Sequence, residues 1–233
     1  MSTLLADLGN TRLKLYFEGK VSCFSTNNYF DIEEFQRLIS AKEFDSVKVV
    51  YSTPELVFEK FLDNVGSSSI QIIGSNDVPL DVLTKGTGVD RLLSAYGAYK
   101  KWGASIVLDF GTALTVDCVN SKGQFVGGSI GLGFSRIKKE FNESLPHLNF
   151  QDGVVNFEGI PSDTSGAILD GVLGTYVAGV QFLTDQYSNC FKDSSPQYVL
   201  TGGDADYFEP YFPKSVKEPF LLFDSMLSLP PSG

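Results

Sequence analysis

A chain of 233 residues with a formal net charge of −10 can form one large domain or two domains of about 100 residues each. It has no run of Lys and Arg, which excludes the usual footprint of a nucleic-acid-binding protein and makes an anionic membrane surface an unexpected partner. The three cysteines are scattered and His147 is the only histidine, which favours reduced thiols and excludes any mechanism that needs two histidines.

The first half of the chain predicts an antiparallel three-stranded opening, followed by alternating helices and strands. The strands are expected at residues 3–6, 13–17, 21–25, 47–51 and 70–73, and the helices after Asp31 and from Thr53-Pro54. The first turn reads Asp7-Leu8-Gly9-Asn10-Thr11, and a helix is expected at residues 89–102, with Asp90 and Arg91 on its first turn. An acid at this position is often only a favourable partner of the helix dipole.

The second half repeats the opening. An apolar strand at 106–108 leads into Asp109, Gly111 and Thr112, and the strand pattern resumes at 115–117 and again at 124–128. Alone, this turn reads as an ordinary β-hairpin. Its repetition favours two domains, at residues 1–103 and 104–233, each with a turn that presents a carboxylate, backbone N–H groups and a hydroxyl. Two such turns can hold a polyphosphate and its cation.

Three later segments complete the pattern. Glycines between residues 127 and 133 predict a loop that bends sharply or approaches a ligand closely. Residues 164–187 predict a long helix, and the strand at 198–200 ends in Thr201-Gly202-Gly203-Asp204-Ala205, a turn that can present backbone donors to an anion. The N-terminus has no signal-peptide pattern, and no uninterrupted apolar run approaches the roughly 20 residues of a membrane span, so a soluble cytoplasmic protein is expected.

Four motifs, in this order, resemble those of type III pantothenate kinases. They read Asp7-Leu8-Gly9-Asn10-Thr11, Gly88-Val89-Asp90-Arg91, Asp109-Phe110-Gly111-Thr112-Ala113 and Thr201-Gly202-Gly203-Asp204-Ala205. The resemblance implies a duplicated ribonuclease-H-like fold, shared with acetate and sugar kinases, Hsp70 and actin, in which two mixed sheets with flanking helices enclose a nucleotide cleft. It also implies ATP-dependent phosphorylation of pantothenate, the first step towards coenzyme A.

The resemblance also implies roles for individual residues. Asp90 would be the general base, and Gly88, Val89, Asp90, Arg91 and Thr164 would bind pantothenate. Asp7 would serve the Mg²⁺–ATP side, and Asp109 would help hold a monovalent cation, K⁺ or NH₄⁺. The residues implied to bind ATP are Asp7, Leu8, Gly9, Asn10, Thr11, Arg12, Lys14 and Leu13 of the first turn, with Thr112, Gly202 and Gly203. Phosphoryl transfer depends mainly on positioning and charge neutralisation, so this set requires no histidine or cysteine.

Small residues along the long helix predict close packing against another helix. Ala167, Gly171, Gly174 and Ala178 fall on one stripe, and the partner helix could belong to the same subunit or to a second one. The family resemblance favours a homodimer in which Thr164 contacts pantothenate bound to the neighbouring subunit. Two alternatives stay open: a kinase or phosphatase of the same fold for another small molecule, and a regulatory protein that has lost turnover.

Overall fold

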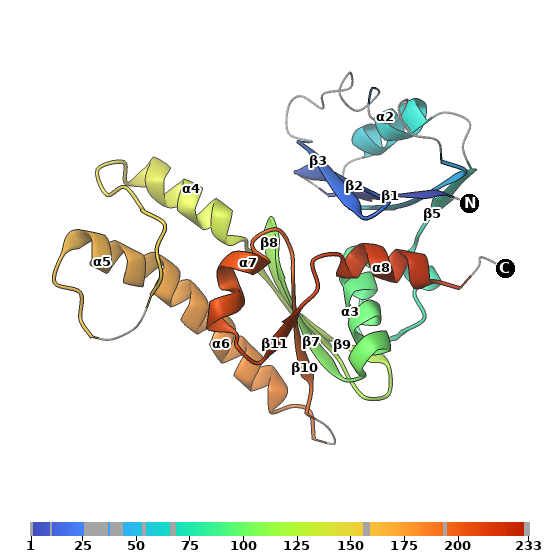
Figure 1. Cartoon of the computed structure of the whole chain (residues 1–233). Coiled ribbons are helices and arrows are strands. Elements are labelled where there is room, and N and C mark those ends of the chain that lie inside the picture. Colours follow the sequence, from blue (N-terminus) through green and yellow to red (C-terminus); the bar gives the residue numbers. More distant parts are fainter. Residues whose placement is uncertain are drawn as a thin grey trace. The chain divides into compact units, whose positions relative to one another are not determined.

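The structure, a computed structural model, describes residues 2–9, 11–25, 37, 44–52, 55–65, 69–155, 159–192 and 195–230. The chain divides into two compact units (Figure 1). Unit 1 comprises Met1–Leu80, Lys85–Gly97 and Leu221–Gly233, and unit 2 comprises Asp81–Thr84 and Ala98–Phe220. The boundary between residues 103 and 104 stays a prediction.

Unit 1 contains a five-stranded mixed sheet in the order β3-β2-β1-β4-β5. The strands are β1 (Thr3–Leu8), β2 (Arg12–Phe17), β3 (Lys20–Ser25), β4 (Ser46–Tyr51) and β5 (Ser69–Ile72). The first three pair antiparallel, whereas β4 runs parallel to β1 and β5 parallel to β4. The predicted strands of this half are therefore confirmed.

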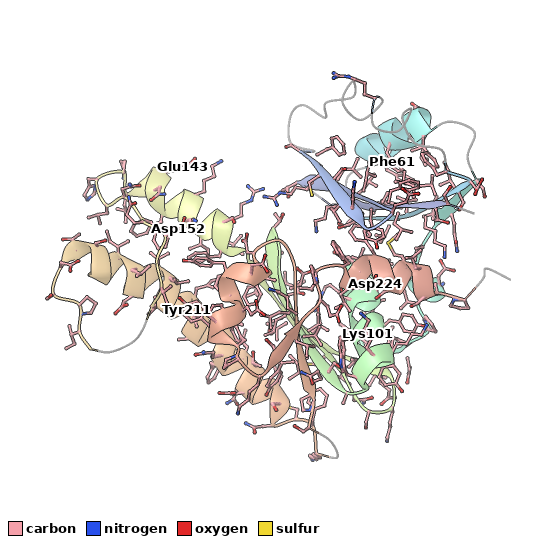
Figure 2. All side chains as sticks on the ribbon, viewed as in Figure 1. Phe61, Lys101, Glu143, Asp152, Tyr211 and Asp224 are labelled. Carbon is pink, nitrogen blue, oxygen red and sulfur yellow. The ribbon has the colours of Figure 1, made fainter. Side chains whose placement is uncertain are left out.

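Helices cover both faces of this sheet. On one face, Leu4 and Ala6 of β1 pack in a buried cluster with Phe61 of α2 (Glu55–Val65) (Figure 2). On the other face, Tyr16 of β2 stacks on Phe223 of α8 (Leu221–Ser228) with ring centroids 5.2 Å apart. A short 3₁₀ turn, Ser75–Asp77, follows β5. The strand alternation that places Leu4 and Ala6 towards α2 places Asp7 on the α8 face.

Unit 2 contains a six-stranded mixed sheet in the order β11-β10-β7-β8-β9-β6. Its strands are β6 (Asp81–Val82), β7 (Ser105–Phe110), β8 (Ala113–Val119), β9 (Gln124–Leu132), β10 (Gln197–Thr201) and β11 (Ser215–Lys217). The order β9-β8-β7-β10-β11 repeats the order β3-β2-β1-β4-β5, with the same antiparallel and parallel pairs. The repeat confirms the predicted duplicated fold of two mixed sheets with flanking helices.

The helices of unit 2 pack mainly on one face of its sheet. They are α4 (Phe134–Ser144), α5 (Thr164–Leu169), a π-helical turn (Asp170–Gly174), α6 (Thr175–Ser188), α7 (Ala205–Phe208) and a 3₁₀ turn (Glu209–Tyr211). Leu108 and Phe110 of β7 are buried in one cluster with Val177 of α6 and Phe208 of α7. Helix α3 (Val89–Trp102), predicted with these bounds, contributes residues 89–97 to unit 1 and 98–102 to unit 2.

Several local predictions need correction. The glycines at 127, 128 and 131 lie within β9 and not in a loop. Gly128 is needed for close pairing of the strands, because a Cβ there would lie 2.1 Å from the carbonyl oxygen of Val116 on β8. Helices α4 and α8 and strand β11 were not predicted. Apart from residue 37, the helix expected after Asp31 lies outside the described residues, as do Thr53 and Pro54.

The expectation that no segment resembles a membrane span also needs correction. The stretch Thr164–Ser188 is long and apolar enough to cross a membrane, with a mean hydropathy of 1.4 over its most apolar window. Polar residues interrupt the apolar runs of this stretch, so its average hydropathy is high although no single run is long. The criterion rests on length and composition alone, and the core helix of a soluble protein meets it too, so it is weak evidence for a span.

Candidate active site

The first turn of unit 1 joins β1 to β2 and carries a buried carboxylate. Asp7 and Lys14 are directly opposite in the antiparallel pair, so their side chains share one face of the sheet. The Lys14 ammonium lies 3.5 Å from the Asp7 carboxylate, whose side chain is 14% exposed. The turn closes where the Gly9 N–H donates to the Arg12 carbonyl at 2.9 Å. The predicted Asp7 turn is therefore a tight connection with its carboxylate largely withdrawn from water.

Asp90 lies on the first turn of α3, also in unit 1. Its Oδ1 accepts a hydrogen bond from the N–H of Arg91 at 2.9 Å. A Cβ at Gly88 would lie 2.5 Å from this same oxygen, so the carboxylate occupies space that any larger residue at position 88 would fill. The glycine of the Gly88-Val89-Asp90-Arg91 motif thus has a physical reason, because it leaves room for the Asp90 side chain.

The charge of Asp90 influences the Asp7 carboxylate. Burial raises the pKa of Asp7 above its ordinary value, Lys14 opposes that rise, and the negative charge of Asp90 adds to it. The structure therefore brings the predicted ATP-side acid within electrostatic range of the predicted general base. A cation beside Asp7 would offset both the desolvation and the repulsion, as expected of a group that faces a metal-bound polyphosphate.

The second turn, in unit 2, connects β7 to β8. The Gly111 N–H donates to the Ala113 carbonyl at 3.1 Å, and Thr112 is exposed. Asp109 takes the position in β7 that Asp7 takes in β1: each is one residue before the end of the strand, and each has a direct partner on both neighbouring strands. The two turns are therefore equivalent parts of the duplication.

Two further segments meet the second turn. Gly202, with a φ of +94°, lies so close that a Cβ there would be 2.4 Å from Asp109 Oδ1, and the Asp204 N–H donates to the Phe110 carbonyl at 2.9 Å. Gly133, which precedes α4, donates its N–H to the Thr112 carbonyl at 3.1 Å. Both glycines permit a close backbone approach that a side chain would prevent.

The structure assembles the predicted residues in two groups. In unit 1 it brings the Asp7 turn together with Asp90, and in unit 2 it brings Asp109 together with Gly202. Leu8 and Leu13 are buried in the core of unit 1, so only their backbone could reach a ligand. Asn10 lies outside the described residues. Thr164 is exposed at the start of α5, whose N-cap Asp163 accepts the Gly166 N–H at 2.8 Å.

Sequence reasoning missed one polar contact of this group. The Ser135 hydroxyl, near the start of α4, donates to Asp204 Oδ2 at 2.9 Å and joins α4 to the Gly202 turn. The available signal was Gly133-Phe134-Ser135 at the end of a strand, which is a plausible helix start. The prediction of a loop at residues 127–133 hides this helix start, because β9 in fact continues to Leu132 and α4 begins at Phe134.

Comparison with known proteins gives one family. The family model described as type III pantothenate kinase matches residues 3–186. A curated relative named type III pantothenate kinase, from Azobacteroides pseudotrichonymphae, is 34% identical over 220 residues, covering 88% of this chain and 86% of its own length.

Two solved structures show the fold. A Campylobacter jejuni protein described as a conserved Baf family transcriptional activator matches with a TM-score of 0.69 at 22% identity, covering 96% of this chain and 95% of its own. A Listeria monocytogenes protein described as an N-acetylmannosamine kinase matches with a TM-score of 0.51 at 11% identity, covering 97% and 99%. At these identities the likeness concerns the fold alone.

Proposed function

Because the chain belongs to the type III pantothenate kinase family, we propose that it transfers the γ-phosphoryl group of ATP to the primary hydroxyl of pantothenate. The products are ADP and 4′-phosphopantothenate, and the reaction is the first step of coenzyme A biosynthesis. The observation that carries the proposal is the pair of acidic turns in equivalent strand positions, together with a third carboxylate, Asp90, near the first. We further propose a cytoplasmic protein without nucleic-acid or membrane partners.

In this mechanism each described residue has one task. The Asp90 carboxylate accepts the proton of the attacking hydroxyl, and its hydrogen bond from the Arg91 N–H fixes its orientation. Gly88, Val89 and Arg91 line the pantothenate site. The residues of the Asp7–Lys14 turn bind ATP with Thr112, Gly202 and Gly203, largely through backbone N–H groups and through the Lys14 ammonium.

The donor set suits hard cations. Among the described residues there is no cluster of three His, Cys, Asp or Glu that could hold a metal alone. Mg²⁺ commonly uses one or two carboxylates together with substrate phosphates, and Asp7 offers one buried carboxylate. We propose that Asp7 faces Mg²⁺–ATP and that Asp109 helps hold K⁺ or NH₄⁺. When bound, these cations neutralise the charge that develops on the transferring phosphoryl group.

The function is tested by coupled ADP release from purified protein with Mg²⁺ and K⁺. We expect ATP consumption with pantothenate and none with acetate or hexoses as acceptors. Turnover with one of those acceptors instead would favour another kinase of this fold. Absence of turnover with every acceptor, in folded protein that binds ATP, would favour a regulatory protein.

The cation assignment predicts the behaviour of Asp109→Asn. This variant should lose its activation by K⁺, because the neutral amide keeps the shape of the carboxylate but attracts a cation less strongly. The rate is measured against K⁺ concentration at constant ionic strength, with Asp63→Asn on the exposed surface of α2 as a control. Unchanged K⁺ activation in Asp109→Asn would remove the assignment.

A homodimer is proposed from the outer surface of the long helix. Ala167, Gly171 and Ala178 are exposed, and a Cβ at Gly171 would meet nothing within 4 Å among the described residues. Gly174, predicted on the same stripe, is instead buried. The π-helical turn adds a residue per turn and so rotates the stripe, which continues through Phe182, 62% exposed. Among the described residues no helix of the same chain covers Gly171, which favours a second subunit.

The shared site predicts complementation between two inactive variants. If Thr164 contacts pantothenate bound to the partner, a dimer of one Asp90→Asn and one Thr164→Arg subunit has one site that carries both changes and one that carries neither. Random mixing should then restore about one quarter of wild-type activity, because half of the dimers are mixed and each has one intact site.

Subunit exchange is verified by native mass spectrometry, and Thr164→Ser, which keeps the hydroxyl, serves as an active control. A monomer by light scattering, or verified exchange without any recovery of activity, would contradict the shared site.

A further inference from the structure

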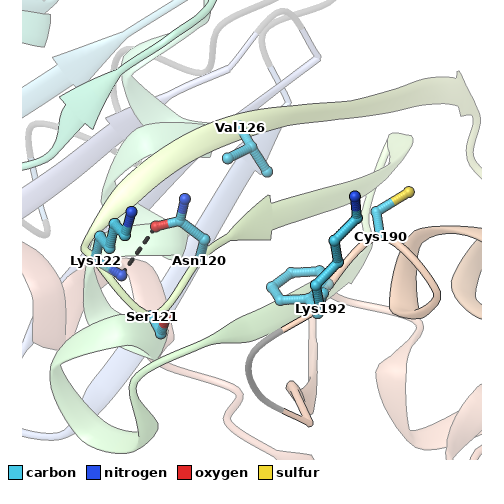
Figure 3. Close-up of a pocket in the computed structure, with 7 residues that line it drawn as sticks. Asn120, Ser121, Lys122, Val126, Cys190 and Lys192 are labelled. Atoms are coloured by element: carbon cyan, nitrogen blue, oxygen red, sulfur yellow. Dashed lines mark hydrogen bonds between the residues drawn. The ribbon is translucent and has the colours of Figure 1, made fainter.

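A cavity of about 280 Å³ lies beside the turn between β8 and β9 in unit 2 (Figure 3). Its lining residues are Asn120, Ser121, Lys122, Val126, Cys190, Phe191 and Lys192. A second cavity of about 260 Å³ shares Val126, Cys190 and Phe191 with it and extends to Gly127, Gly128 and Tyr187. Strand β8 begins at Ala113, beside the Asp109 turn, and ends at Val119, beside this cavity. Six steps of about 3.4 Å separate the two places by roughly 20 Å, so the cavity is distinct from the proposed phosphate site.

The floor of the cavity is apolar because of an irregularity in the sheet. Cys118 pairs with Gly127 and Val119 with Phe125, which leaves Val126 as an extra residue on β9. Such a bulge redirects a side chain out of the regular alternation. Val126 is 41% exposed and lines the cavity with Phe191.

The turn that forms one wall is held by its own hydrogen bonds. Asn120 Oδ1 accepts the N–H groups of Lys122 at 3.0 Å and Gln124 at 3.1 Å, and its Nδ2 donates to Gln124 Oε1 at 2.9 Å. Gln124 Nε2 in turn donates to Asp81 Oδ2 at 2.7 Å. The wall is therefore preorganised, which lowers the entropy lost when a ligand binds.

Two cationic side chains come from opposite walls. Lys122 belongs to the β8–β9 turn and Lys192 to the segment after α6, and Figure 3 shows them on opposite sides of the cavity. Within the described part of the chain, neither ammonium has an ion pair, although the protein carries 28 acidic and only 18 basic residues. An anion that binds between the two walls would be attracted by both ammonium groups.

We propose that this cavity is a second ligand site, which binds a small phosphate monoester with a compact apolar group. The doubly charged phosphate lies between Lys122 and Lys192 within reach of the Ser121 hydroxyl, and the apolar group packs on Val126 and Phe191. A dianion matches two ammonium groups, and the apolar floor disfavours free inorganic phosphate. The site is independent of the proposed kinase activity, since it shares no residue with it.

The chain contains its own reporter of occupancy. Cys190 is exposed and lines both cavities, whereas Cys23, on β3 of unit 1, is exposed elsewhere. The test measures the rate of iodoacetamide alkylation of each thiol by peptide mass spectrometry, with phenyl phosphate as the probe. We expect phenyl phosphate to slow alkylation of Cys190 and to leave Cys23 unchanged, with weaker protection by inorganic phosphate and by benzoate.

Lysine variants test the charge requirement. Lys122→Gln and Lys192→Gln should each raise the Kd for phenyl phosphate, from the protection curve, by about tenfold, because each loses a charged hydrogen bond. Lys139→Gln, an exposed lysine that pairs with Glu143 on α4, is the control and should bind as wild type. Equal protection of Cys190 and Cys23, equal protection by benzoate, or full protection in the doubly substituted protein would overturn the proposal.

Discussion

Replacing Asp90 by asparagine is expected to lower kcat for pantothenate phosphorylation by about 10²–10⁴-fold, the usual cost of removing a general base. The asparagine side chain keeps the size of the carboxylate and has an oxygen that can still accept the Arg91 N–H, so helix α3 should begin as it does now. The KM for ATP should change little, because the variant loses a proton acceptor and no phosphate contact. Initial rates and far-UV circular dichroism together check this expectation.

Asp63→Asn provides a matched control for Asp90→Asn. Asp63 is exposed on α2 of the same unit and has no place in the proposed chemistry. Its substitution should leave the rate unchanged. A folded Asp90→Asn protein with near-wild-type turnover would show that Asp90 is only a partner of the helix dipole.

The sequence predicted the repeated strand and turn pattern because local chemistry determines it. Asp7 and Asp109 each follow an apolar strand and precede a glycine, and both the strand alternation and the need for a tight turn can be read without knowledge of the partner strands. Helix α3 was predicted with its observed bounds for the same reason, since its apolar spacing and its first-turn acid both lie within the segment.

Other features depend on contacts that the sequence does not display. Read locally, Gly128 predicts a loop. A glycine is needed there because a Cβ would lie 2.1 Å from the backbone of β8. The π-helical turn before α6 moves Gly174 into the core, and a regular helical period cannot show that rotation. The Gly88 motif is recognisable by resemblance, yet the physical reason for its glycine is the position of the Asp90 carboxylate, which depends on the folded backbone.

Asp7→Asn should produce opposite effects on activity and on stability. Burial raises the pKa of Asp7, so ionisation of this group costs free energy in the folded, ligand-free protein. A raised pKa means that the folded state binds the proton more tightly than the unfolded state does. Stability therefore falls as the pH rises from the ordinary pKa of an aspartate through the raised pKa, and the loss persists at neutral pH.

The asparagine removes this cost, and it should raise the midpoint of thermal unfolding of the ligand-free protein at pH 7. The gain should shrink on acidification, because the wild-type carboxylate is then protonated too. Lys14→Gln should act in the opposite direction, since it removes the cation that lowers the pKa of Asp7.

Activity should respond in the other direction. The loss of a carboxylate that faces Mg²⁺–ATP is expected to reduce kcat/KM by about 10²–10³-fold, comparable to the loss of one preorganised electrostatic group. Mg²⁺–ATP should also raise the unfolding midpoint of wild type more than that of the variant, because a ligand that binds only the folded state stabilises it according to its affinity. Such a trade-off between stability and activity is common where a binding site contains a buried charge that only the ligand neutralises. An Asp7→Asn protein that is less stable than wild type at pH 7 without ligand, or one stabilised equally by Mg²⁺–ATP, would show that Asp7 serves the fold through Lys14 and does not face the nucleotide.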